Sequence, residues 1–217
     1  MRALGWVRAT RNKTTSYWAH SILNTYGRND AMSVGSQVSD AMRKLSEDRF
    51  EDAVVAASVA LSARARLEHP TGGDKAACRK FLEQNLPIIS KIGWVAFGVS
   101  QPINFRYRRL DSHAPGTAVR TMPEMLYDVV RCTAVHEAKL PDNLQFTNQP
   151  VIHLCNDGEL ILPIDLIYGL LMAVVASKKN ADQQIERDPV FSFGGKNIGI
   201  NELWGDRGKI ETFIGVK

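Results

Sequence analysis

With 217 residues, a net charge of +4 and 44% hydrophobic residues, the chain is long enough to bury the core of one globular domain. Three scattered cysteines without a Cys-x-x-Cys spacing argue against a disulfide framework and against a zinc site, and they are typical of free thiols in the cytoplasm. No secretory signal is visible, and the longest charge-free apolar run, residues 166–177, is shorter than the roughly 18 residues of a membrane span, so we expect a cytoplasmic protein without membrane attachment.

The first 30 residues form a basic N-terminal arm, which carries five basic side chains and one acidic side chain. The remainder of the chain is therefore electrically balanced. The arm also contains four aromatic residues, Trp6, Tyr17, Trp18 and Tyr26. Charge and stacking together would allow such an arm to contact nucleic acid, although the same aromatic side chains could equally pack on the core.

Helical patterns follow the arm. Apolar residues at helical spacing predict a first helix over residues 31–45. Ser46 is a suitable N-cap for a second helix, rich in alanine and valine, that runs to about Leu67. A third helix is expected over residues 74–86. A proline then interrupts the pattern, and residues 88–97 either continue as a kinked helix or form a strand.

Residues 101–120 are the least regular stretch of the sequence, and we expect a loop there. This stretch contains Arg106, Arg108 and Arg109 around Tyr107. Three arginines and an aromatic side chain could line a channel for RNA. The alternative is an ordinary solvated cluster of charges.

A strong helix-start signal follows this loop. Thr121 is a suitable N-cap, Glu124 can reach back to it as the second half of a capping box, and Pro123 falls in the first turn. The predicted helix spans residues 124–140, because Pro141 cannot continue it.

This helix places one arginine and one histidine, Arg131 and His136, among apolar residues. Positions five apart are rotated by about 140° and lie about 7.5 Å apart along the axis, so the two side chains can meet only in a shared cleft or through two copies of the helix. Arg131 could hold a phosphate and His136 could move a proton near neutral pH. Alternatively, Arg131 pairs with Asp128 and His136 joins a structural network near the helix end.

The string Leu-Tyr-Asp-Val-Val-Arg-Cys-Thr-Ala-Val-His-Glu at residues 126–137 resembles the R-x4-H motif of the HEPN family (higher eukaryotes and prokaryotes nucleotide-binding domains). The resemblance covers residues 31–184 as a helical pattern. It implies a metal-independent endoribonuclease, often a toxin or an antiviral effector, that uses no cofactor and has the motif at a homodimer interface. By resemblance, Arg131 and His136 are the catalytic residues, RNA is the partner, and an antitoxin or regulatory partner would restrain the activity.

A second functional class remains open. The residue after the arginine is Cys132, and the residue two past the histidine is Ala138, where active members of the HEPN family often have other side chains. These two positions favour a non-catalytic HEPN-like module that binds RNA, a nucleotide or a partner protein without cleaving it.

The pattern changes after the motif helix. A β-hairpin is expected over residues 151–162, because Asn156-Asp157-Gly158 is a strong turn signal. Residues 163–183 then form a helix that is apolar almost all round, which indicates central burial or a subunit interface. The tail, residues 188–217, suggests a second hairpin around Gly194-Gly195. The sequence thus predicts a single, mainly α domain, a HEPN-like bundle of about five or six helices with one or two peripheral β-hairpins.

Overall fold

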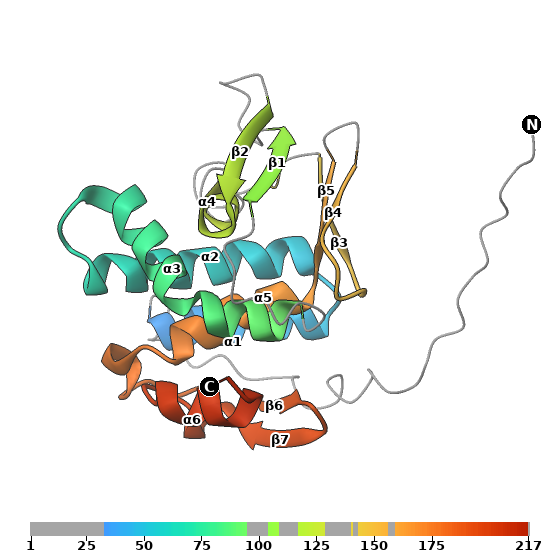
Figure 1. The fold of residues 1–217 in the computed structure, drawn as a ribbon. Coiled ribbons are helices and arrows are strands. Elements are labelled where there is room, and N and C mark those ends of the chain that lie inside the picture. Colours follow the sequence, from blue (N-terminus) through green and yellow to red (C-terminus); the bar gives the residue numbers. More distant parts are fainter. Residues whose placement is uncertain are drawn as a thin grey trace, which may run out of the picture.

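The computed structural model describes residues 33–94, 104–108, 117–128, 140, 143–155 and 159–216, and at residues 104–108 and 117–119 it describes the backbone alone. The basic arm (residues 1–30) and the predicted turn at 156–158 lie outside these ranges. Within them the chain is mainly α-helical with small peripheral sheets, which confirms the predicted fold class (Figure 1). The described ranges contain six α-helices: α1 (Val34–Ser46), α2 (Phe50–Glu68), α3 (Gly73–Gly93), α4 (Met122–Tyr127), α5 (Asp165–Val175) and α6 (Arg207–Ile214).

The first helix is the one that its apolar spacing predicts. Ser33 caps it by accepting a hydrogen bond from the Ser36 backbone N–H at 3.0 Å. The predicted cap of the second helix is wrong, because Ser46 is the last residue of α1 and its hydroxyl donates to the Arg43 carbonyl at 2.6 Å. Since that hydroxyl is used within α1, α2 begins four residues later, after Arg49.

Helix α3 runs without a break through Pro87, so the alternative of a strand after this proline is wrong for residues 88–93. A proline removes one backbone hydrogen bond from a helix. Here the helix continues because Ile88, Ile89 and Ile92 are buried, and α3 packs against α5 over this half.

Helix α5 is the central element, and it packs against both α2 and α3. Nine of its eleven residues are buried, in agreement with its all-round apolar sequence. It is shorter than the predicted span 163–183, since the chain turns into a 3-10 helix at Lys178–Asn180. The buried Asn180 side chain donates to the Val174 carbonyl at 2.7 Å and accepts from Arg64, so polar side-chain bonds replace the helix there. Among the described residues, no helix is long and apolar enough to cross a membrane.

Three small sheets lie around the helices. Their strands are β1 (Asn104–Arg108), β2 (Thr117–Thr121), β3 (Leu144–Thr147), β4 (His153–Leu154), β5 (Leu160–Pro163), β6 (Val190–Phe193) and β7 (Lys196–Gly199). The antiparallel pair β4–β5 confirms the first predicted hairpin, and the antiparallel pair β6–β7 confirms the second.

Two strand pairings and one helix are absent from the sequence prediction. The antiparallel pair β1–β2 occupies part of the segment expected to be a loop. Strand β3 adds to β5 in parallel, which gives the order β3-β5-β4. In the predicted tail, the short 3-10 helix Ile200–Glu202 and α6 follow β7. Helix α6 is fixed to α3 by Arg207, whose guanidinium donates to Asn85 Oδ1 and to the Gln84 carbonyl, each at 2.9 Å.

Candidate functional site at the α3–α4 surface

Helix α4 begins with the capping box that the sequence predicts. The Thr121 backbone N–H donates to Glu124 Oε2 at 3.0 Å, and the Thr121 hydroxyl lies 3.2 Å from the same oxygen. Met125 and Leu126 are fully buried, and α4 packs on α3. The start of the predicted motif helix is therefore anchored firmly to the helical core.

The predicted catalytic residues Arg131 and His136 lie outside the described residues, as does Arg109. Arg106 and Arg108 belong to β1, at alternate positions opposite Val119 and Thr117 of β2. Strand β1, which carries these two arginines, pairs with β2. Strand β2 leads directly into α4, where the predicted motif helix begins (Figure 1).

Charged side chains of α3 and β2 surround α4. Arg79 Nη2 of α3 lies 2.8 Å from Glu124 Oε1, and Arg120 Nε of β2 lies 3.7 Å from Asp128 Oδ2. The Lys75 ammonium lies 5.8 Å from the centre of the Tyr127 ring, within the range of a cation–π interaction. Two cations of α3 thus contact α4, and a third cation, Arg120, pairs with the residue that follows this helix.

The pKa of Glu124 is held below its ordinary value of 4.5. The hydrogen bond from the Thr121 backbone N–H is the largest cause of this shift; the positive charges of Arg79 and Arg120 also lower the pKa, and partial burial opposes them. Glu124 therefore remains ionised at neutral pH and pairs with Arg79 near the start of α4.

The outer face of α3 forms a basic groove next to this contact. The groove has a volume of about 560 Å³ and is lined by Gly72, Lys75, Ala76, Arg79, Lys80 and Glu83. Three cations and one anion give these lining residues a net charge of 3 − 1 = +2. The sequence interpretation did not include this groove, although Lys75 and Arg79 stand four residues apart on one face of a predicted helix.

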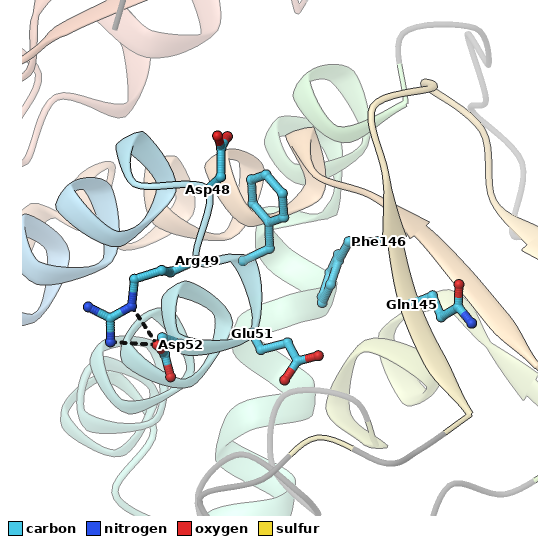
Figure 2. Close-up of a pocket in the computed structure, with 7 residues that line it drawn as sticks. Asp48, Arg49, Glu51, Asp52, Gln145 and Phe146 are labelled. Carbon is cyan, nitrogen blue, oxygen red and sulfur yellow. Dashed lines mark hydrogen bonds and ion pairs between the residues drawn. The ribbon is translucent and has the colours of Figure 1, made fainter. Parts of the chain in front are cut away.

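A second hollow, with a volume of about 420 Å³, lies between the α1–α2 turn and β3 (Figure 2). It is lined by Asp48, Arg49, Phe50, Glu51, Asp52, Gln145 and Phe146. Three anions and one cation give these residues a net charge of 1 − 3 = −2. Figure 2 shows Arg49 directed to Asp52, which Arg49 Nη2 contacts at 2.6 Å, while Phe146 faces the start of α2 from β3.

The charges of the two hollows decide which of them can accept a polyanion. The acidic pocket at the α1–α2 turn would repel phosphate groups, whereas the basic groove on α3 would attract them. Within the described ranges, no three His, Cys, Asp or Glu side chains gather as a metal site.

A model of the Rv1289 family matches residues 33–217, so the chain belongs to the Rv1289 family. No curated protein and no solved structure matches the chain. The matched region begins at Ser33, the N-cap of α1, and therefore includes every described element but not the basic arm.

Proposed function

We propose that this member of the Rv1289 family is a metal-independent endoribonuclease with a HEPN-type site, in which Arg131 and His136 act on the scissile phosphate. The observation that carries the proposal is the position of this pair in the sequence. Arg131 follows Tyr127 by four residues, and Tyr127 lies in a capped helix that packs on α3 and is contacted by Lys75 and Arg79 of that helix.

The chemistry needs only these two side chains and the RNA itself. The ribose 2′-oxygen attacks the neighbouring phosphorus and the 5′-oxygen of the next nucleotide leaves, which produces a 2′,3′-cyclic phosphate and a 5′-hydroxyl end. In this proposal, His136 takes the proton from the 2′-hydroxyl or gives a proton to the leaving oxygen. The Arg131 guanidinium binds the phosphate and stabilises the additional negative charge of the transition state.

A homodimer belongs to the proposal, since side chains five positions apart on one helix diverge by about 140°. Two copies related by a twofold axis would bring Arg131 of one subunit toward His136 of the other. Such a ribonuclease would act in the cytoplasm as a toxin or antiviral effector, with an antitoxin or regulatory partner to restrain it.

The test compares three full-length proteins, the wild type, His136→Ala and Arg131→Ala, on a labelled single-stranded RNA in the presence of EDTA. We expect the wild type to cleave the RNA with cyclic phosphate ends and each variant to lose at least about 100-fold in rate, as is typical when a general base is removed. RNA that stays intact with the wild type would leave the non-catalytic module as the interpretation. Equal cleavage by wild type and variants would assign the activity to a contaminant.

A further inference from the structure

The basic groove on α3 has two lysines whose charge is not used in ion pairs with other described residues. Lys75 and Lys80 are exposed, whereas Arg79 between them pairs with Glu124. The nearby carboxylate of Asp74 forms an ion pair with Arg66. The positive potential of this face is therefore available to a ligand.

The shape of the groove suits a chain rather than a small molecule. Two of its lining residues, Gly72 and Ala76, have no long side chain, and Gly72 has φ of +98°, a conformation that disfavours any larger residue. The lining extends from Gly72 to Glu83, which corresponds to about 16 Å along the helix. An open hollow of this length would accommodate a few nucleotides of an extended strand.

The groove adjoins α4. Lys75 contacts the Tyr127 ring, and Arg79 contacts Glu124, so two lining residues touch α4 directly. A strand bound along α3 would reach the end of α4, from which the chain continues to Arg131.

We propose that this groove binds the sugar–phosphate backbone of single-stranded RNA, with Lys75 and Lys80 on phosphates; the choice of RNA as ligand rests on the proposed function. Lysine is a flexible point charge that contacts phosphates without regard to base sequence, so the groove provides affinity and not sequence specificity. Double-stranded RNA is usually recognised over about 16 base pairs, far more than one helical face of this length covers.

The experiment measures RNA binding separately from cleavage. All proteins carry His136→Ala so that the RNA stays intact, and the dissociation constant for a fluorescein-labelled single-stranded RNA is followed by fluorescence anisotropy in EDTA over a range of salt concentrations. The test variant is Lys75→Gln/Lys80→Gln. The matched control is Lys178→Gln/Lys196→Gln, which removes the same charge from two exposed positions, one in the 3-10 helix Lys178–Asn180 and one in β7.

We expect the test variant to bind at least about 10-fold more weakly. Each neutralised phosphate of a single strand contributes about 0.7 to the slope of log affinity against log salt, so loss of two contacts should reduce the slope by about 1.4. The control should keep the original affinity and slope. Since all four lysines lie at the surface, unfolding temperatures should remain unchanged, and this is checked for each protein.

Three results would overturn the proposal that the groove binds RNA: no RNA binding by the parent protein, unchanged affinity and slope in the test variant, or equal weakening in the control. Tighter binding of an RNA duplex through the same lysines would overturn the choice of a single strand. The failures of the two proposals are distinguishable. If the wild type does not cleave RNA but the test variant still loses binding, the ribonuclease proposal fails and the groove proposal stands. If the wild type cleaves RNA and the test variant binds normally, the groove proposal fails and the ribonuclease proposal stands.

Discussion

Glu124 connects the start of α4 to two neighbouring elements through one carboxylate. It accepts a hydrogen bond from the Thr121 backbone N–H and pairs with Arg79, and its pKa is lowered accordingly. A carboxyl whose pKa is lowered by folding stabilises the protein above its ordinary pKa of 4.5, and this contribution is lost as the pH falls through the lower, folded value.

We therefore expect Glu124→Gln to cost up to about 0.5 kcal/mol in the free energy of unfolding at neutral pH, because glutamine keeps the acceptor but not the charge. Glu124→Ala, which also removes the cap, should cost about 1 kcal/mol. Urea denaturation at neutral pH and below pH 4.5 measures both. The difference between wild type and the glutamine variant should disappear in acid, and a difference that persists would show that the charge is not its cause.

Arg64 is the buried counterpart of these surface arginines. Only 4% of it is exposed, its guanidinium donates to Asn180, and among the described residues its Nε has no hydrogen-bond partner. Arg64→Ala should destabilise the fold by about 3 kcal/mol, since it leaves Asn180 unsatisfied and opens a cavity at the end of α2. The control is Arg66→Ala, two residues further along α2. It removes only a surface ion pair with Asp74 and should cost less than about 1 kcal/mol.

At the scale of the elements, local signals were sufficient for α1, for the body of α2, for α3 as far as Pro87 and for both predicted hairpins. They were not sufficient where pairing depends on distant residues. The sequence of Leu144–Thr147 contains no hairpin turn, so it did not predict a strand. The segment forms β3 because it pairs in parallel with residues 160–163. In the same way, β1 and β2 are joined by residues that include Pro115 and Gly116, and the sequence therefore indicated only a loop over the whole stretch.

The packing of α3 on α5 depends on a glycine that periodicity alone does not single out. A Cβ atom at Gly169 would lie 2.7 Å from the Ile89 carbonyl oxygen, closer than atoms in contact allow. Because the obstacle is backbone of α3, Gly169→Ala must separate the two helices, and we expect a loss of about 2 kcal/mol in the free energy of unfolding.

Gly208→Ala in α6 provides the comparison. The nearest neighbour of a Cβ atom at Gly208 is Asp206 Oδ1 at 3.7 Å, an ordinary contact. Alanine has a higher helix propensity than glycine, so this variant should be neutral or more stable by up to about 1 kcal/mol. Thermal and urea denaturation of both variants test the difference; equal effects would show that α3 and α5 do not approach closely at this point.

For the whole molecule, the sequence predicted the local contacts at the start of α4 but not what packs around this helix. The capping box at Thr121 and Glu124 could be predicted because it is local. The groove on α3 could not, since Lys75 and Arg79 are ordinary helix-surface residues until α4 packs beside them. The arrangement of charges, one basic groove and one acidic pocket, is a property of the folded chain.

The proposed twofold site makes a prediction that no single subunit can satisfy. If Arg131 of one subunit works with His136 of the other, then Arg131→Ala and His136→Ala, each inactive alone, should restore activity when mixed. A mixed dimer holds one site in which both side chains are intact and one in which both are missing. Random exchange makes half of the dimers mixed, so the mixture should recover about a quarter of the wild-type rate per subunit.

Ribonuclease assays after refolding the two variants together, with sedimentation to establish the dimer, give the measurement. A mixture as inactive as its components, in a protein that is nevertheless dimeric, would place each arginine and histidine in a site within one subunit, and α4 would then have to continue into a bend that lets them meet.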